Sequence, residues 1–533
     1  MKYFSYLLRR HGVKPAYLVN LGAAALITMP SCSGEGEKDA KEDKAQKPNI
    51  VYILTDDLGY GDVGCYGQDK IETPNIDELA EEGILFTQHY SGSPVSAPAR
   101  CVLLTGKHTG HSYIRSNDPL GERGDVWDFE KASKDPGLEG QRPIPGETVT
   151  IGEVLQEAGY TTGCVGKWGL GPPMSEGAPN NQGFDFYYGY ICQRQAHTYY
   201  PLHLWKNDKK DTLDNKLVPP HTELPEEADP YDPESYSRFR LTDYAPDLMI
   251  EETMQFLERN KQDPFFMYYA TPIPHLPLQA PKRWVEHYVE KFGDEDPYTG
   301  DNGYFPSRYP RATYAAMISY MDENVGKIVD KLKETGVYEN TLIIFTSDNG
   351  PTYTGGADTP WFNSGGPFKE ERGWGKGYLH EGGIRVPMIA TWPGKVEPGT
   401  VTNHISAIWD VFPTLCDVAG VEPPQDLDLD GISFLPALLG QDDQEKQEVM
   451  YWEFPSYNGQ QAVRFGKWKA IRKDIFDGNM DVELYNLHTD PMEQHDVSDQ
   501  YPEILEKAKE YMKEERESPV VEGFRMKQLG DTL

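Results

Sequence analysis

The sequence predicts an α/β fold in which a mainly parallel central sheet is sandwiched between helices. Short apolar runs alternate along the chain with segments of helical periodicity. Two of these runs, 49–55 and 341–346, contain no charged residue and are rich in β-branched residues, as fully buried strands are. With 533 residues, of which 38% are hydrophobic, the chain is long enough for one large domain and a smaller one.

The individual elements follow from the periodicity of the apolar residues. Amphipathic patterns predict helices at 74–86, 150–160, 248–260 and 312–336. Uncharged apolar runs predict strands at 49–55, 161–166, 264–270, 341–346 and 386–392. Pro74 begins the first helix, and Gly159 and Gly336 end the second and the fourth. Strands and helices therefore alternate, as they do in parallel sheets with crossover helices.

The pattern changes near Gln441. Residues 441–448 form a charged break, and 462–473 and 482–491 then alternate like antiparallel strands. Residues 502–515 have helical periodicity. We therefore predict a large catalytic domain over 47–445 and a small α+β subdomain over 446–533, with an antiparallel sheet of about four strands.

The N-terminal residues are typical of a targeting segment. Basic residues precede an apolar stretch, 16–29, that is too short to span a bilayer, and Ser31 then precedes Cys32. This resembles a bacterial lipoprotein signal, although Met29-Pro30 departs from the usual pattern and leaves ordinary secretion as the alternative. We expect a signal peptide (1–31), lipidation of Cys32 and a disordered tether (32–46). The resemblance implies a periplasmic or cell-surface lipoprotein of a Gram-negative bacterium, with membrane contact only through the lipid anchor.

The charge and the cysteines exclude several classes of function. A formal net charge of −34 argues against nucleic acid and against an anionic membrane surface as partners. An anionic substrate would bind only where cations are concentrated locally. The cysteines other than Cys32 form no C-x-x-C pair, so a zinc or thioredoxin-like site is not predicted.

Acidic side chains follow two of the predicted strands. Asp56 and Asp57 come after strand 49–55, and Asp348 and Asn349 come shortly after strand 341–346. Ligands of open α/β sheets bind beyond the carboxyl ends of the strands, and oxygen ligands suit calcium or magnesium. Either pair alone is also typical of a turn with Asx hydrogen bonds. Together, however, the carboxylates would repel one another unless a cation lay between them.

Basic residues also gather at the ends of predicted elements. A single lysine is normally a solvated surface charge. Here, however, several cations and a histidine follow strands or lie in glycine-rich loops, where binding sites are assembled. They are Arg100, Lys107, Lys167, His275 and Lys376. Together with the carboxylates they predict a metal-assisted site for a tetrahedral anion.

The segment "SAPAR" (96–100), followed by "LLTGK", resembles the signature of type I sulfatases. In that signature a cysteine or serine before x-P-x-R is oxidised to formylglycine. "GKWGLG", "PHLP", "SDNG" and "GKGYLHEGGIRVP" also match motifs of the family in the expected order. The resemblance extends from about residue 47 into the C-terminal region. It implies an alkaline-phosphatase-like fold, hydrolysis of sulfate esters and a maturation enzyme that oxidises the serine.

The resemblance also implies roles for individual residues. An aldehyde at position 96 would hydrate, one oxygen would attack sulfur, and the second hydroxyl would then eject sulfate. The implied calcium ligands are Asp56, Asp57, Ser96, Asp348 and Asn349. The implied catalytic groups are Arg100 and Lys107 on the formylglycine, Lys167 and Lys376 on the sulfate, and His275 on the sulfate or the leaving alcohol. The family usually reads G-K-W-H-L-G, whereas this chain has Gly169 at the histidine position.

Residues 172–243 form a long segment rich in aromatic residues, which suit a sugar ring and are also common packing residues. We therefore predict a sulfated glycan as substrate. "CQRQAH" together with "GKWGLG" resembles bacterial sulfatases that act on sulfated galactose or N-acetylgalactosamine, which implies a 4- or 6-sulfate of one of these sugars. Arg194, His197 and His111 are the predicted substrate contacts, and His197 either replaces the missing histidine or binds the sugar. The alternatives are a phosphoester hydrolase of the same superfamily and a catalytically silent glycan-binding lipoprotein that keeps Ser96 unmodified.

Overall fold

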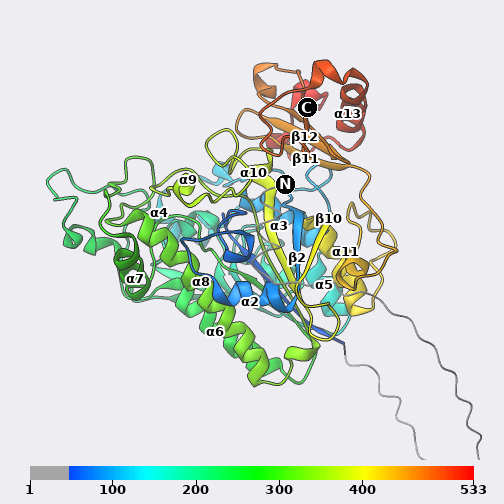
Figure 1. The fold of residues 1–533 in the computed structure, drawn as a ribbon. Helices are drawn as coiled ribbons and strands as arrows, with labels where there is room; N and C mark the ends of the chain where they lie inside the picture. Colours follow the sequence, from blue (N-terminus) through cyan, green and yellow to red (C-terminus); the bar gives the residue numbers. More distant parts are fainter. Residues whose placement is uncertain (1–46, 533) are drawn as a thin grey trace, which may run out of the picture. The chain divides into compact units, whose positions relative to one another are not determined.

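The computed structural model describes residues 47–532 (Figure 1). The predicted signal peptide, Cys32 and the tether lie outside the described residues. Within 47–532, no helix combines the length and the apolar character that crossing a bilayer requires. The described residues form one compact unit, so the domain boundary predicted at 445 stays a prediction.

A ten-stranded sheet lies at the centre, in the order β10-β2-β9-β8-β1-β7-β3-β4-β5-β6. The five strands from β8 to β4 in this order are mutually parallel, whereas β9 and β5 are antiparallel to their neighbours. The prediction of a mainly parallel sheet is thus confirmed. The strands are β1 (Asn49–Thr55), β2 (Ile84–Tyr90), β3 (Thr161–Lys167), β4 (Phe186–Tyr190), β5 (His203–Lys206), β6 (Lys209–Thr212), β7 (Phe265–Ala270), β8 (Thr341–Ser347), β9 (Arg385–Thr391) and β10 (Thr400–Ala407).

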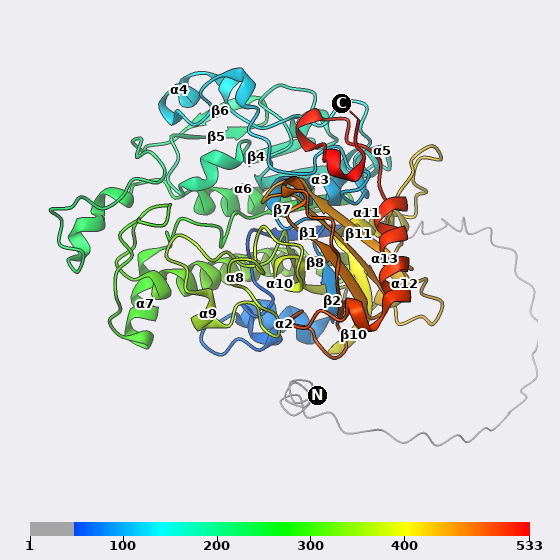
Figure 2. The same cartoon turned by 90° about the horizontal axis from the view of Figure 1, so that it is seen from above.

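Helices cover both faces of the sheet (Figure 2). Because side chains alternate along a strand, β1 contributes Ile50, Tyr52 and Leu54 to one apolar core, and Val51 and Ile53 to the other. The first core is closed by α3 (Ser96–Thr105), α5 (Ile151–Glu157) and α11 (Val411–Ala419). The second core is closed by α2 (Pro74–Glu82), α6 (Ala245–Asn260), α7 (Lys282–Phe292) and α8 (Pro310–Glu334). Shorter helices are α4 (Phe129–Lys134), α9 (Thr359–Phe362), α10 (Glu381–Ile384) and α12 (Leu435–Leu438).

Two predicted segments differ from the structure. The helix predicted at 74–86 ends at Glu82, and the residues after Gly83 form strand β2. Gly83 lies so close to β9 that an added Cβ would be 2.3 Å from the Ala390 carbonyl oxygen. The aromatic segment 172–243, in which we predicted no strand, contains the sheet strands β4, β5 and β6.

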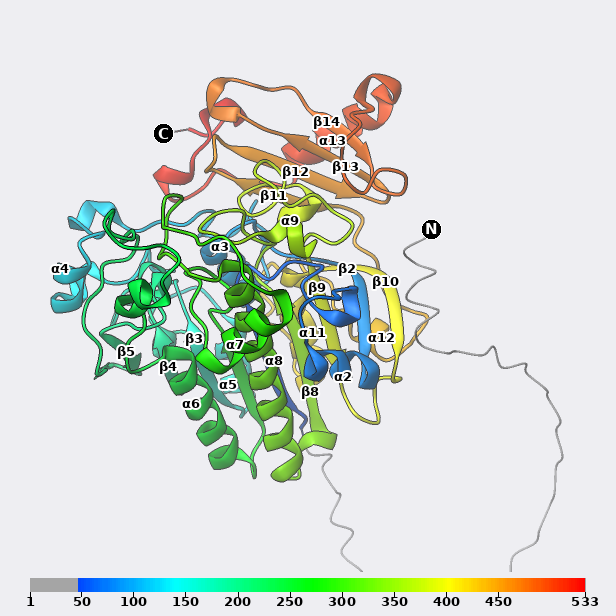
Figure 3. The same ribbon diagram turned by 60° about the vertical axis from the view of Figure 1, so that its left-hand side comes forward.

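The C-terminal region contains a second sheet (Figure 3). Strands β11 (Met450–Phe454), β12 (Gln460–Phe465), β13 (Trp468–Arg472) and β14 (Glu483–Asn486) are antiparallel, and helix α13 is Pro502–Glu514. This agrees with the predicted four-stranded sheet and closing helix. On one face of the sheet, Trp452, Ala462 and Ile471 join the core formed with α3, α5 and α11.

A buried ionic network also joins the second sheet to the large one. Lys469 of β13 is fully buried and lies 2.9 Å from Glu381 and 3.0 Å from Glu493. Glu381 begins α10, directly after the glycine-rich segment that carries Lys376. Because a buried charge is costly without its partners, Lys469 fixes the position of α10 and so constrains the Lys376 segment.

Candidate active site

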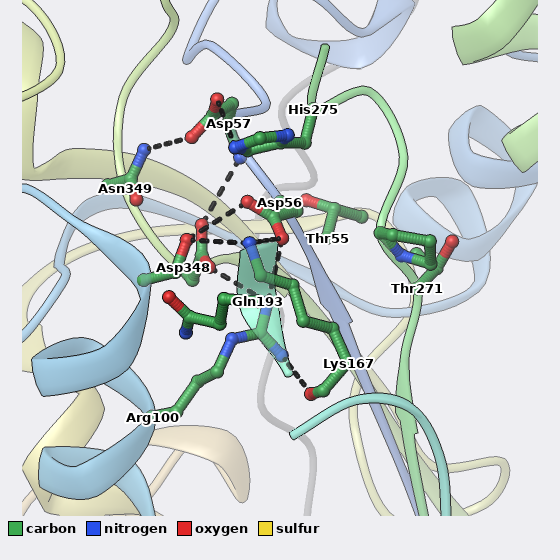
Figure 4. A network of polar contacts seen from close by, with 12 residues as sticks. Thr55, Asp56, Asp57, Arg100, Lys167, Gln193, Thr271, His275, Asp348 and Asn349 are labelled. Atoms are coloured by element: carbon green, nitrogen blue, oxygen red, sulfur yellow. Dashed lines mark hydrogen bonds and ion pairs between the residues drawn. The ribbon is translucent and has the colours of Figure 1, made fainter. Parts of the chain in front are cut away.

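The acidic residues meet where two neighbouring strands end. Strands β1 and β8 pair in parallel with Thr55 opposite Ser347, so the residues that follow leave the same edge of the sheet. The Asp57 backbone N–H donates to Asp348 Oδ1 at 3.2 Å, and Asp57 itself adopts a left-handed φ of 65°. Figure 4 shows the resulting cluster. Its members are each no more than 1% exposed: Asp56, Asp57, Asp348 and Asn349.

Helix α3 directs its N-terminus at this cluster. Ser96 is its first residue, is 2% exposed, and donates from Oγ to Asp56 Oδ1 at 3.1 Å. Arg100, one turn later, places Nη2 at 2.9 Å from Asp348 Oδ2 and 3.2 Å from Asp56 Oδ2. Its Nη1 donates to the Lys167 carbonyl oxygen at 2.8 Å. Arg100 therefore connects the ends of three strands.

Two lysines and a histidine complete the cluster. Lys167 Nζ lies 2.5 Å from Asp56 Oδ2 and 3.2 Å from Ser96 Oγ. Lys376 Nζ lies 2.6 Å from Asp57 Oδ2. His275 has Nδ1 at 2.7 Å from its neighbouring carbonyl oxygen, so Nδ1 carries the proton and the lone pair of the neutral ring is on Nε2. That Nε2 lies 3.9 Å from Asp57 Oδ2.

Burial and neighbouring charges shift the pKa values in opposite directions. Burial and the nearby Asp56 raise the pKa of Asp348 to about 6, and burial likewise raises the pKa of Asp57. Burial alone would raise the pKa of Asp56, but Lys167 and the other cations hold it well below its usual value. Burial and the charge of Lys376 lower the pKa of His275 well below its usual value. His275 is therefore neutral at pH 7 in the free protein.

The cluster fits a hard divalent cation. The Asn349 amide donates to Asp57 Oδ1 at 2.7 Å and to the Gly350 carbonyl oxygen at 2.9 Å. This leaves Asn349 Oδ1 buried and without a hydrogen-bond partner within the described residues. Ligand atoms of Asp56, Asp57 and His275 lie within 4.8 Å of one another. Several carboxylate oxygens and an unused amide oxygen are the donors that calcium prefers.

A rim of histidine and aromatic side chains lies beside the cluster. His197 stacks on His275 with ring centroids 5.5 Å apart, and its Nδ1 lies 3.1 Å from His221 Nε2. Tyr304 and Trp127 lie 5.1 Å and 6.1 Å from the His197 ring. Sequence reasoning found His197 but missed the other three, which come from distant loops without a motif. Trp127 is 50% exposed and is the clearest platform for a ligand ring.

Three predicted site residues lie elsewhere. Lys107 lies beyond the far end of α3, a helix that rises about 14 Å from Ser96 to Thr105, so the structure does not bring it into the cluster and its role on the formylglycine stays a prediction. Arg194 is 4% exposed, and its guanidinium donates to backbone carbonyls at 119, 126, 138 and 140. It lies 5.6 Å from the Trp127 ring, so it supports the rim and is not available as a substrate contact.

His111, the third of these residues, belongs to a separate cluster beyond the far end of α3. Its Nδ1 lies 2.8 Å from Asp430 Oδ1, and its ring stacks on His108 at 4.6 Å. His108 Nδ1 accepts from the Gly110 N–H at 3.1 Å, so Nε2 carries the proton and faces Asp430 and Glu515. A protonated nitrogen is a donor and not a metal ligand. His111 is therefore hydrogen-bonded within this separate cluster, which the structure does not join to the carboxylates around Ser96, and its role as a substrate contact stays a prediction.

Family models and curated relatives both identify this chain as similar to sulfatases. Residues 48–421 match the family model described as Sulfatase, and residues 370–518 match the model described as N-sulphoglucosamine sulphohydrolase, C-terminal. The chain is 30% identical over 450 residues to N-acetylgalactosamine-6-sulfatase of Canis lupus familiaris, covering 84% of this chain and 74% of the relative. It is 29% identical to N-acetylgalactosamine-6-O-sulfatase of Bacteroides thetaiotaomicron, covering 92% and 97%.

Solved structures show the same similarity. The crystal structure of Ps i-CgsB superposes with a TM-score of 0.67 at 28% identity, over 89% of this chain and 94% of that one. The same protein has been solved in complex with k-i-k-neocarrahexaose.

The His111–Asp430 pair should stabilise the fold in a limited pH range. Burial alone would lower the pKa of His111, but Asp430 raises it; burial alone would raise the pKa of Asp430, but His111 lowers it. The contribution of His111 to the stability of the fold is complete below the pKa that His111 has in the unfolded chain. It is lost as pH rises through the higher pKa that His111 has in the folded protein. The Asp430 contribution is present above its unfolded pKa and is lost as pH falls through the folded one. The pair is thus strongest between about pH 4 and 6.5.

We expect His111→Gln to lower Tm more at about pH 5.5 than at about pH 8.5, without changing turnover. His488→Gln, at an exposed histidine, should leave Tm unchanged at both pH values. Thermal denaturation monitored by fluorescence measures both variants. An equal loss of Tm at the two pH values would contradict the ion-pair role, and a loss of turnover would return His111 to the active site.

Proposed function

The chain belongs to the sulfatase family of sulfuric ester hydrolases, and on this premise we propose that it desulfates a glycan using a formylglycine at position 96 and a calcium ion. The observation that carries the proposal is the position of Ser96. This residue lies in the "SAPAR" segment, is buried at the N-terminus of α3, and contacts both Asp56 and Lys167.

As a serine, residue 96 is poorly equipped for nucleophilic catalysis. Within residues 47–532 no histidine is hydrogen-bonded to its hydroxyl. Asp56 is a weak base because the cations around it hold its pKa far below the usual value. When present, formylglycine supplies a hydrated aldehyde whose hydroxyl group is the nucleophile. Because Ser96 is 2% exposed in the folded chain, the maturation enzyme must act before folding is complete.

The residues that would hold calcium are Asp56, Asp57, Asp348 and Asn349, together with residue 96. The ion supplies positive charge that polarises the nucleophile. Arg100 holds Asp56 and Asp348 in place from the side of α3, and its positive charge favours the ionised form of both carboxylates. The α3 N-terminus adds partial positive charge beside residue 96.

The lysines and His275 act on the sulfate ester. Lys167 and Lys376 place ammonium groups on either side of the cluster, where they neutralise charge that develops on the sulfate oxygens. His275 is neutral in the free protein. A bound sulfate ester brings negative charge next to its ring, which raises its pKa and favours the protonated form. Protonated His275 can then donate to the leaving alcohol oxygen.

The rim supports a sugar substrate. Trp127 is half-exposed beside His197, and His221 and Tyr304 add polar groups next to aromatic faces. Relatives are named as N-acetylgalactosamine-6-sulfatases, and a structural neighbour has been solved in complex with k-i-k-neocarrahexaose. We infer galactose or N-acetylgalactosamine 4- or 6-sulfate as the substrate class. We also infer that the chain is exported as a periplasmic or surface lipoprotein, as its N-terminal residues indicate.

The first test concerns maturation. We expect Ser96→Ala to abolish turnover without unfolding the protein, since only the nucleophile is lost. In wild-type protein from a host with the maturation enzyme, the peptide containing residue 96 should be about two mass units lighter than its sequence requires. Ser93→Ala is the matched control, because the Ser93 hydroxyl is buried nearby and makes no hydrogen bond within the described residues. Full turnover by Ser96→Ala would exclude the formylglycine mechanism.

The second test concerns the metal. Asp348→Asn keeps the shape of the side chain but removes a charge that a cation requires, so calcium content and turnover should both fall, turnover by about 100-fold or more. Asp62→Asn is the matched control, because Asp62 is equally buried but is bonded to Tyr314 and Ser364. Elemental analysis and kinetics measure the two effects. Metal-free, chelated protein that kept its full rate would show that the ion is not required.

The third test concerns His197. Burial and the neighbouring His275 lower its pKa well below the usual value, so it is neutral and suited to binding a hydroxyl group. We expect His197→Ala to raise KM for a sulfated galactose or N-acetylgalactosamine by about tenfold, with little change for an aryl sulfate. His287→Ala, on an exposed helix face, is the control. A loss confined to kcat on the sugar would instead identify His197 as the acid.

A further inference from the structure

Gly169 occupies the position where the sulfatase motif usually has a histidine, and the space beside it is filled. An ideal Cβ at Gly169 would lie 2.5 Å from Gln193 Nε2 and 2.8 Å from Gln193 Cγ. Gly169 also has a φ of +90°, which disfavours any side chain. The side chain of Gln193 therefore takes the place that a side chain at 169 would need. His197, four residues later in the same 3-10 helix (Gln193–His197), stacks on His275 instead.

The orientation of the Gln193 amide is determined by Gln141. The Gln193 backbone N–H donates to Gln141 Oε1 at 3.3 Å, which fixes that amide with its nitrogen toward the Gln193 side chain. Gln141 Nε2 then donates to Gln193 Oε1, also at 3.3 Å. A backbone N–H cannot act as an acceptor. Exchanging the nitrogen and oxygen positions of either side-chain amide would therefore break these hydrogen bonds. Gln193 Nε2 must therefore point away from Gln141.

Gln193 Nε2 is a buried donor without a partner. Gln193 is 6% exposed, and its Nε2 has no hydrogen-bond acceptor within the described residues. Because a buried donor without a partner is destabilising, an acceptor is expected in the working enzyme. Figure 4 draws the Gln193 amide among the side chains of the catalytic network. Gly169, which it contacts, is two residues from Lys167, whose ammonium group lies 3.2 Å from Ser96 Oγ.

We propose that Gln193 is a catalytic residue that donates from Nε2 to the sulfate group of the substrate, in place of the histidine that the motif usually carries. This inference rests on the proposed function. An amide donates at every pH and carries no charge, so Gln193 can stabilise the anion but cannot protonate the leaving alcohol. The proton for the alcohol must then come from another group, which in the proposed function is His275.

The test separates hydrogen bonding from packing. Gln193→Met keeps the volume beside Gly169 but has no donor, and Gln193→Ala removes both. We expect both variants to lose about 100-fold in kcat/KM on an aryl sulfate, because one donor to a developing oxyanion is lost. Both should also bind inorganic sulfate about tenfold more weakly in calorimetric titrations. Formylglycine content by mass and calcium content are measured in each variant, so that a failure of maturation is recognised.

Gln195→Ala is the matched control. Gln195 lies in the same 3-10 helix, but its amide donates to Glu139. We expect its kinetics and sulfate affinity to stay within about threefold of wild type. Wild-type rates and sulfate affinity in Gln193→Met would overturn the proposal and leave an ordered water as the partner of Nε2. A wild-type enzyme that is oxidised and metal-loaded, yet hydrolyses no sulfate ester, would contradict the proposed function instead. The sulfate titration would then still decide the role of Gln193, because binding needs no turnover.

Discussion

The structure depends on the way three buried carboxylates are neutralised at the end of the central sheet. Asp56, Asp57 and Asp348 are almost completely buried, and like charges this close repel by several kcal/mol even when screened. Arg100 relieves part of this repulsion by bridging Asp56 and Asp348. The bridge also fixes helix α3 against the ends of β1 and β8, and thereby places residue 96. The same electrostatic requirement therefore determines the position of the nucleophile.

The remaining cations are supplied by parts of the chain that the fold must hold firmly. Lys167 comes from the end of β3, so the parallel register of the sheet positions it. Lys376 comes from an irregular glycine-rich segment, which needs external support. That support includes the second sheet, whose buried Lys469 binds Glu381 just after the segment. The C-terminal region thus contributes to the site by supporting the segment that carries Lys376. A chain with net charge −34 can bind an anion because its cations converge at this point.

The sequence predicted site residues correctly where they come directly after the end of a predicted strand. The pairs at 56–57 and 348–349 could be placed together because parallel strands end at one edge. It failed where position depends on tertiary geometry. Lys107 is close to Ser96 in sequence, but a helix of ten residues separates the two in space. Arg194 looked like a binding residue because its carbonyl partners come from a loop whose path no periodicity reveals. Strand β2 was missed because Ile84, Leu85 and Phe86 were read as the last turn of the helix that ends at Glu82.

Gly169 and Gln193 show why the roles of site residues cannot always be assigned from a motif position by position. The two positions are complementary, since any Cβ at 169 would overlap the amide of 193. A histidine at 169 would lie in the segment that follows strand β3, whereas Gln193 belongs to the 3-10 helix that also carries His197. With Gln193 as a sulfate donor and His197 as a sugar contact, one short helix binds both parts of the substrate. Movement of that helix would then change sulfate binding and sugar binding together, whereas a donor at 169 would be independent of this helix.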